Sequence, residues 1–119
     1  MNKNSSKNIA TEVINLEIEA LKILKKSINK SFDKAVNTIV NCQSKIILCG
    51  VGKSGLIAAK IASTLSSVGS PAFSLSANDC LHGDLGSITK KDILILISNS
   101  GKSEEIIPII KFANRNKIK

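Results

Sequence analysis

The stretch Lys45–Gly55, which reads Lys-Ile-Ile-Leu-Cys-Gly-Val-Gly-Lys-Ser-Gly, decides the fold. Its short apolar run breaks into three glycines, which are Gly50, Gly52 and Gly55. An amphipathic run over residues 54–68 follows, so the order predicts a strand, a tight glycine turn and a helix. The first turn of a helix carries unpaired N–H groups and partial positive charge, and Lys53 adds a full charge there. The turn is therefore suited to hold a small anion.

The alternation of strand and helix continues on both sides of this stretch. Further strands are predicted over residues 72–75 and 92–97, and Pro108 delays or kinks the helix that follows. Helices are predicted ahead of it over 10–28 and 31–40, the first with an apolar face broad enough for burial on two sides. The pattern predicts an α/β fold with a parallel sheet, in which the chain ends after the third strand and its helix.

Composition narrows the function classes. The 119 residues are 43% hydrophobic and carry a net charge of +8, yet there is no Trp or Tyr and only three Phe. Three Phe side chains offer no platform for base stacking, so we expect no nucleic-acid partner. No apolar run is long enough to span a bilayer, and the polar amino terminus does not resemble a signal peptide. Three cysteines fit no metal or disulfide spacing, so we expect a cytoplasmic protein with reduced thiols.

Two loops are candidates for anion binding. Residues 50–55 match G-x-G-x-x-G, the dinucleotide fingerprint, but the second strand ends in Ser74-Leu75-Ser76 and lacks the acidic residue that holds a ribose. Residues 98–103, Ser-Asn-Ser-Gly-Lys-Ser, offer hydroxyls and N–H groups at a helix start, a neutral cradle for a phosphate monoester. The alternative for this second loop is an ordinary serine-rich turn in which Ser103 caps the helix.

Two side chains are candidates for chemistry. Glu105 lies one turn beyond the serine loop, where it could act as a general base or could simply favour the helix dipole. His82 is the single histidine and could contact a ligand or be an ordinary surface residue. Its neighbours Asp79, Cys80 and Asp84 lack a ligand spacing, so we expect no metal site and no cofactor.

Three motifs occur together in a fixed order, and they are Gly-Val-Gly-Lys-Ser-Gly, His-Gly-Asp-Leu-Gly at 82–86, and Ser-Asn-Ser-Gly at 98–101 followed by Ser103 and Glu105. With these motifs the chain resembles the sugar isomerase (SIS) domain family, and within it the arabinose-5-phosphate isomerases, from the first helix onward. The resemblance implies a flavodoxin-like three-layer sandwich. It also implies interconversion of D-ribulose 5-phosphate and D-arabinose 5-phosphate, for Kdo and lipopolysaccharide synthesis.

The resemblance also implies roles for individual residues. Lys53 and Glu105 take the positions of catalytic residues, because aldose–ketose isomerisation passes through an enediolate and needs a base and a cation. The positions implied for substrate binding are Gly52, Ser54, Gly69, Ser70, His82, Ser98, Asn99, Ser100 and Ser103.

The chain departs from the family in ways that matter for activity. Lys102 occupies a position where relatives have Glu. Asp79 also occupies a position where relatives have Glu, and the Glu side chain is longer. Relatives are tetramers, use a further glutamate and histidine from the second half of the domain, and typically carry two CBS modules after it. We expect a disordered tail over 1–8, a helical lead-in over 9–43 and phosphosugar-binding βα units over 44–119, with no CBS domain.

The expected product is therefore a homo-oligomeric, weakly active or inactive isomerase with a phosphorylated pentose as its ligand and no membrane partner. A non-catalytic phosphosugar-binding SIS module is the alternative, and a dinucleotide-binding fragment is a less favoured one. No helix-turn-helix precedes the domain, so we do not expect a DNA-binding regulator.

Overall fold

The computed structural model describes residues 5–119, which fall into two compact units that divide after Val36. The first described unit contains helix α1 (Ser6–Ser27) and the start of α2 (Lys30–Val40). In the part of the chain that is described, no helix is both long enough and apolar enough to cross a membrane.

Helix α1 begins earlier than the sequence suggested. The hydroxyl of Ser5 accepts a hydrogen bond from the backbone N–H of Asn8 (3.3 Å), which caps the first turn. The helix thus occupies part of the segment that we expected to be disordered, and residues 1–4 lie outside the described residues. At the start of α2 the Asn29 side chain accepts a hydrogen bond from the Ser31 nitrogen (2.9 Å).

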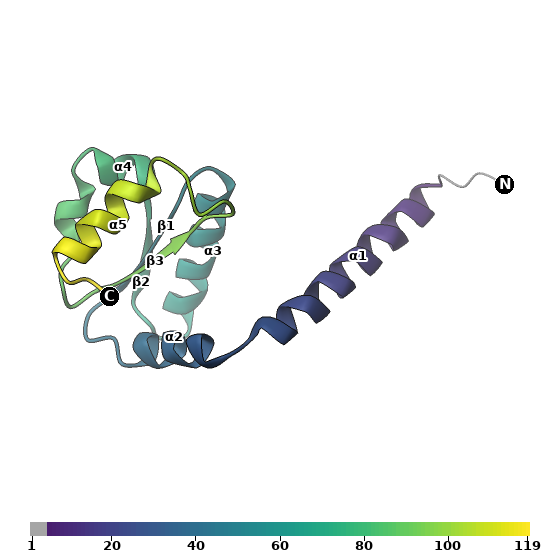
Figure 1. Cartoon of the computed structure of the whole chain (residues 1–119), viewed down its shortest axis with the longest axis horizontal. Helices are drawn as coiled ribbons and strands as arrows, with labels where there is room; N and C mark the ends of the chain where they lie inside the picture. The colour runs from purple at the N-terminus through teal and green to yellow at the C-terminus, as the bar shows by residue number, and fades with distance from the viewer. Residues whose placement is uncertain (1–4) are drawn as a thin grey trace. The chain divides into compact units, whose positions relative to one another are not determined.

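The second unit is built on a parallel sheet (Figure 1). Its strands are β1 (Ile46–Gly50), β2 (Ala72–Ser76) and β3 (Ile93–Ile97), in the order β2-β1-β3. The register places Gly50, Ser76 and Ile97 side by side, so all three strands end at one edge. The predicted α/β class with a parallel sheet is confirmed, and the order β2-β1-β3 is how a flavodoxin-like sheet begins.

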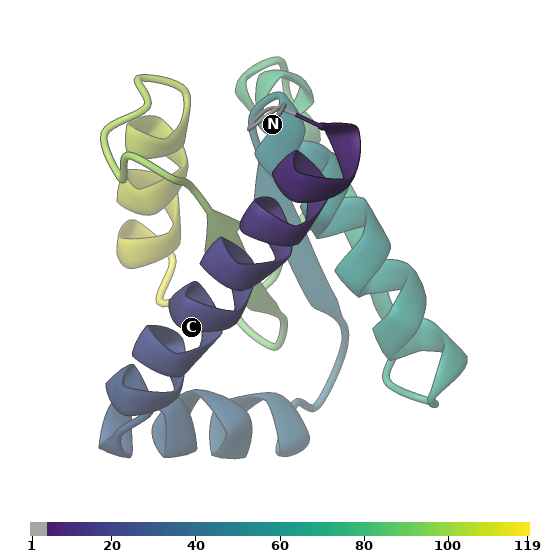
Figure 2. The same cartoon turned by 90° about the vertical axis from the view of Figure 1, so that its right-hand side faces the viewer.

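Helices cover both faces of this sheet, as Figure 2 shows for α3 and α5. Helix α3 (Lys53–Ser67) packs on one face, where Ala58 and Ala62 lie against Ile46 and Leu48. Helices α4 (Ala77–Leu81) and α5 (Ile106–Arg115) pack on the other face around Cys49. The strand residues of β1 are all buried, because each face meets a helix layer.

Small residues bring α3 close to the sheet. Ala58 and Ala62 are buried, whereas the larger apolar side chains of Ile57 and Val68 are exposed. The face that packs on the sheet is therefore the one with small side chains. Small side chains allow the helix backbone to approach the strands, so the burial of alanine fixes its position.

The segment 76–88, between the second and third strands, contains two short helices. Helix α4 is capped by the Ser76 hydroxyl, which accepts from the Asp79 N–H (3.1 Å), and a 3₁₀ turn covers Asp84–Ser87. Five residues are too few for a periodic pattern to appear in the sequence. The late start of α5 at Ile106 agrees with the prediction, because Pro108 then lies in the first turn, where its missing N–H costs no helix bond.

An ion pair lies at the edge of the sheet where the strands begin, opposite the loops. Asp92 is buried and accepts from the Lys45 Nζ (2.9 Å to Oδ2), the Thr89 N–H (2.7 Å) and the Thr89 hydroxyl (3.1 Å). Burial alone would raise the pKa of this carboxyl, but the hydrogen bonds from Thr89 and Lys45 hold it well below its ordinary value. This cluster ties the start of β3 to the start of β1.

The chain returns to the sheet after α5. The backbone N–H of Leu94 donates to the carbonyl of Lys119 (2.9 Å), while the neighbouring Ile93 N–H donates to Lys45 beside β1. Successive N–H groups of a strand point to opposite sides, so Lys119 lies along the side of β3 away from β1. Ile118 is buried just before it.

Candidate functional site

The two predicted anion-binding loops lie at the same edge of the sheet. The glycine turn follows β1 and the serine loop follows β3, and these two strands are neighbours that end in register. From β1 the chain crosses to β2 on one side and later returns to β3 on the other. Ligands in open α/β sheets bind at such a switch point, outside the carboxyl ends of the strands. The fold therefore brings Lys53 and residues 98–105 to one place.

The glycine turn is tight because its backbone packs against itself. A side chain on Gly50 would meet the Ser54 carbonyl carbon at 2.6 Å, and Gly52 has φ +58° with ψ −123°, which side chains rarely allow. The N–H groups of Ser54 and Gly55 donate back to the carbonyls of Val51 and Gly52. The turn thus starts α3 with no side-chain cap, and the first helical residue is the exposed cation Lys53.

The serine loop is held in shape by its own hydroxyls. The Ser98 Oγ accepts from the Gly101 N–H (2.9 Å), and the Ser100 Oγ accepts from the Lys102 N–H (3.1 Å). Each hydroxyl that accepts such a bond keeps its own proton for donation to an anion. Gly101, at φ +67°, lets the loop turn back before α5. Asn99 is exposed at the tip, and Ser103 is half-buried at the helix approach.

Glu105 is half-buried and directly precedes Ile106, the first residue of α5. Its side chain makes no capping hydrogen bond. The alternative in which its charge favours the helix dipole needs no such bond and stays open. His82 ends α4, and α4 packs against Ile106 through Ala77 and Cys80. The structure therefore carries the exposed His82 on an element that touches the start of α5.

Gly69 and Ser70 do not join this site. They lie in the turn between the end of α3 and the start of β2, at the amino edge of the sheet. There they help to line a different hollow of about 260 Å³, together with Cys42, Ser44 and Pro71. Because α3 runs back along the sheet, its two ends face opposite edges, so within one chain Gly69 and Ser70 lie away from the two loops, and their contact with a ligand stays a prediction.

Sequence reasoning also missed part of the site edge. A pocket of about 280 Å³ lies between the glycine turn and the end of β2, and its polar side chains are Ser74, Ser76 and Asn78. Two hydroxyl residues at alternate positions of a strand face the same side, and this spacing was the signal available in the sequence.

The same edge of the sheet is where the dinucleotide-binding alternative would place its ligand. The strand–turn–helix context of the fingerprint is present, but β2 ends at Ser76 without a carboxylate for a ribose. Among residues 5–119 no group of three or more His, Cys, Asp or Glu side chains could hold a metal ion.

Two buried thiols lie just beneath the site. The Sγ atoms of Cys49 and Cys80 are 4.0 Å apart, and both side chains are almost fully buried. Burial, with the neighbouring Cys80, raises the pKa of the Cys49 thiol to about 12, and burial also raises the pKa of Cys80. Both are therefore neutral packing residues that join α4 to β1.

Comparison with known proteins agrees with this geometry. Residues 39–119 match the model of the SIS domain. The arabinose 5-phosphate isomerase KdsD of Yersinia pestis is 45% identical over 107 residues, covering 90% of this chain and 33% of that protein. KdsD of Francisella tularensis is 48% identical over 110 residues, covering 87% of this chain and 34% of that protein.

A solved structure extends the comparison to the fold. The E. coli CFT073 protein c3406, determined in complex with a phosphosugar, superposes with a TM-score of 0.84 and 33% identity, over 95% of this chain and 62% of that one. This chain spans about one third of the length of the curated relatives it matches. With the matched domain model, the parallel sheet and the two loops at its switch point, the chain belongs to the SIS domain family.

Proposed function

We propose that the chain is the phosphosugar-binding part of an aldose–ketose isomerase that interconverts D-ribulose 5-phosphate and D-arabinose 5-phosphate, for Kdo and lipopolysaccharide synthesis. The observation that carries the proposal is the meeting of two helix starts, at Lys53 and at residues 98–105, at the switch point between β1 and β3. One supplies a cation and the other supplies hydroxyls and a carboxylate. Relatives at 45–48% identity named arabinose 5-phosphate isomerase support the choice of sugar.

The residues suggest a division of roles. The hydroxyls of Ser98, Ser100 and Ser103 would hold the phosphate, with the backbone at Gly52 and Ser54 closing the other side. Glu105 would take the proton from C2 of the aldose, and the electron pair would move to form the enediolate. Lys53 would steady the negative charge that develops on O1. Transfer of the O2 proton to O1, with return of the abstracted proton to C1, then yields the ketose, so atoms and charge balance.

His82 would contact the sugar from α4, and Asn99 from the tip of the serine loop. Gly69 and Ser70 lie at the other edge of the sheet of the same chain, so we propose them as substrate-binding residues only for a site shared between copies of the chain. The phosphosugar-binding units begin with β1, and residues 37–43 at the end of α2 lead into the domain.

A second candidate is a phosphosugar-binding module without turnover. The observation that favours it is the serine loop, which its own hydroxyls hold in shape and which could therefore hold a phosphate without any proton transfer by Glu105. In either case we propose a homo-oligomer. A cytoplasmic location is part of the same proposal, because the cysteines at 42, 49 and 80 are free thiols.

Substitution of Glu105 by glutamine tests the isomerase. In D₂O, NMR of arabinose 5-phosphate with the chain should show deuterium entering at C2 and ribulose 5-phosphate appearing. Loss of the general base should slow the exchange by about 10²–10⁴-fold, while the phosphosugar still binds. Glu104→Gln is the matched control, because Glu104 is the exposed neighbour and should leave the exchange rate unchanged.

Two results would change the assignment. Exchange that survives Glu105→Gln would remove this residue from the role of base. Binding of arabinose 5-phosphate by the folded chain, without any exchange, would leave the non-catalytic module as the function.

A further inference from the structure

The serine loop and the approach to α5 together carry excess negative charge. Residues 98–105 contain one cation, Lys102, and two carboxylates, Glu104 and Glu105. A phosphate monoester brings a further charge of about −1.5 to −2 at neutral pH. The segment that we propose to hold the phosphate would therefore repel it if Lys102 were absent.

The start of α5 cannot supply the missing positive charge. A helix amino terminus is equivalent to about half an elementary charge. Glu105 directly precedes Ile106, the first helical residue, and Glu104 lies one residue further back. Both carboxylates thus lie where the helix dipole would otherwise attract the phosphate, and the hydroxyls of the loop are neutral donors. Binding of a phosphate here calls for a full cation close to those hydroxyls.

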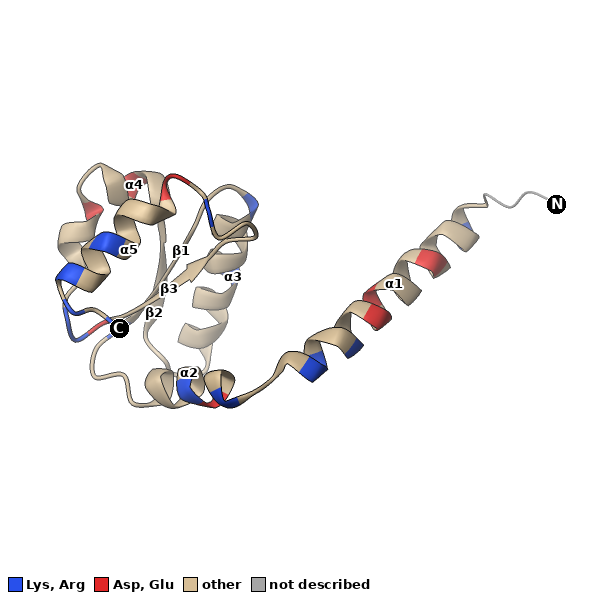
Figure 3. Cartoon of the chain, in the orientation of Figure 1, with Lys and Arg blue, Asp and Glu red and all other residues tan. Residues whose placement is uncertain are grey.

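Each of the two loops at this edge of the sheet carries a cation. Lys53 starts α3 after β1, and Lys102 lies between β3 and α5. Figure 3 shows basic side chains at both places. The proposed function assigns Lys53 to the charge that develops on O1, at the reacting end of the sugar. The phosphate lies at the other end of a pentose 5-phosphate, so Lys102 is the cation that the serine loop offers to it.

The backbone places Lys102 beside the hydroxyls of the serine loop. Its N–H donates to the Ser100 Oγ (3.1 Å), and the preceding N–H, of Gly101, donates to the Ser98 Oγ (2.9 Å). These two hydrogen bonds fix the backbone of Lys102 relative to both hydroxyls. The flexible four-carbon stem of a lysine can then bring its ammonium group over them.

The side chain of Lys102 is accessible to a ligand. The residue is exposed, and among residues 5–119 it makes no ion pair with Glu104 or Glu105. By contrast, the cation Lys45 is held by the buried Asp92. A lysine ammonium is a compact charge with three donors, and charge-assisted hydrogen bonds to phosphate are among the stronger ones in proteins.

We propose that Lys102 is a specificity-determining residue, whose ammonium group binds the phosphate and makes the chain select a phosphorylated sugar over the free sugar. This inference rests on the proposed phosphosugar site, but it does not require turnover there. Because Lys102 would touch the phosphate and not the reacting carbons, its charge should set the affinity for the substrate and leave the rate of proton transfer unchanged.

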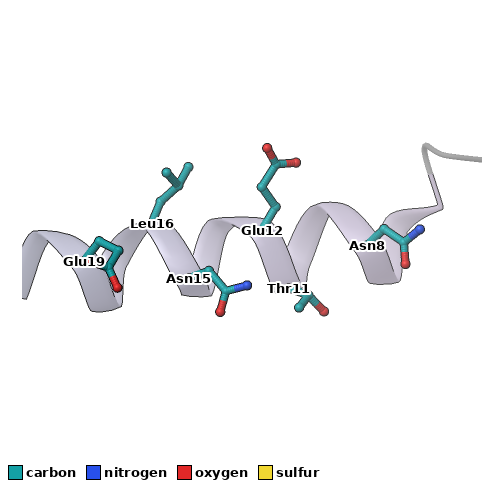
Figure 4. Close-up of a pocket in the computed structure, with 6 residues that line it drawn as sticks. All are labelled: Asn8, Thr11, Glu12, Asn15, Leu16 and Glu19. Atoms are coloured by element: carbon teal, nitrogen blue, oxygen red, sulfur yellow. The ribbon is translucent and has the colours of Figure 1, made fainter.

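The hollow on α1 does not compete for a phosphate. It has a volume of about 410 Å³, and Figure 4 shows that one helix supplies its lining residues, Asn8, Thr11, Glu12, Asn15, Leu16 and Glu19. These six residues include two carboxylates and no cation, so the hollow repels an anion. Phosphate held at α1 should therefore not mask the effect of changing Lys102.

Isothermal titration calorimetry with inorganic phosphate and with arabinose 5-phosphate tests the role of Lys102. Lys102→Gln should weaken binding of both about fivefold, and Lys102→Glu about 25-fold, because each step removes one favourable unit of charge. Lys102→Arg should stay within about twofold of the wild type, because the cation remains. Lys60→Glu, at an exposed position of α3, is the matched control and should also stay within about twofold.

Two further measurements separate the charge of Lys102 from its shape. Raising the salt concentration should weaken phosphate binding by the wild type more than by Lys102→Gln, since screening acts on the charge contact that the variant lacks. In the deuterium exchange experiment, Lys102→Gln should raise the KM for arabinose 5-phosphate about fivefold and leave the exchange rate at saturation unchanged.

The possible outcomes distinguish this inference from the proposed function. Equal phosphate binding by the wild type and by Lys102→Glu would overturn the role of Lys102 alone. Equal losses in Lys102→Arg and Lys102→Gln would also overturn it, because binding would then depend on the shape of lysine and not on its charge. A wild-type chain that binds no phosphate would overturn Lys102 together with the proposed site. Phosphate binding that depends on Lys102 without any exchange would reject the isomerase and support this inference.

Discussion

Replacing Gly50 by alanine is expected to lower the free energy of unfolding by about 3 kcal/mol or more. The new methyl group would lie 2.6 Å from the Ser54 carbonyl carbon, 2.7 Å from its oxygen and 2.8 Å from the Gly55 nitrogen. These are backbone atoms of the first turn of α3, so relief requires the helix to move away from β1. Urea denaturation followed by circular dichroism measures the loss.

The matched control is Gly86→Ala, because a methyl group there would meet nothing within 4 Å. This variant should change the free energy of unfolding by no more than about 0.5 kcal/mol. Equal stability of the two variants would show that α3 can shift at little cost. The same movement should displace Lys53, so phosphate binding by Gly50→Ala should weaken even under conditions where the protein is folded.

Substitution of Asp92 by asparagine is expected to destabilise the second unit by about 3 kcal/mol. The amide has the size of the carboxylate but carries no charge for Lys45 and cannot accept at both oxygens from Lys45 and Thr89. The loss lies at the lower end of the range for a broken buried ion pair because the Lys45 side chain is 31% exposed. Denaturant titration at neutral pH measures the effect.

The pH dependence of stability supplies an independent check on Asp92. Its pKa is lowered by folding, so its contribution is complete above the ordinary aspartate pKa of ~3.9 and declines as the pH falls below that value. Asp92→Asn should therefore cost less stability in acid than at neutral pH. Asp84→Asn, at an exposed position, serves as the control. A cost for Asp92→Asn that is independent of pH would contradict a charged carboxylate in the folded state.

The sequence predicted those strands and helices whose pattern is complete within one continuous stretch of the chain. The run from Lys45 to Val68 contains a strand, a glycine turn and a helix in immediate succession, and each leaves its own pattern. The β-branched run at 93–97 marks a strand in the same way. Helix α4 could not be predicted, because five residues show no period and a serine cap with two packing contacts holds them.

The two loops of the candidate site could be predicted from the sequence, whereas the other residues at its edge could not. Lys53 and Ser98 follow strands directly, so their meeting at one edge follows from parallel topology. Gly69 and Ser70, which the family resemblance placed in the site, lie at the other end of α3 in this chain, and that placement follows from the path of the helix along the sheet. Ser74 and Ser76 were missed because their alignment with the glycine turn depends on the β1–β2 register, which forms between distant segments.

The Asp92–Lys45 ion pair and the two loops of the candidate site lie at opposite ends of the same strands. The ion pair holds β1 and β3 together at one end, and at the other end the hydroxyls of Ser98 and Ser100 accept hydrogen bonds from within their own turn. We therefore expect substitutions at Asn99 or Ser100 to leave the sheet intact. The serine loop could be exchanged to alter the anion that the proposed site would bind, while the ion pair still holds β1 and β3 together.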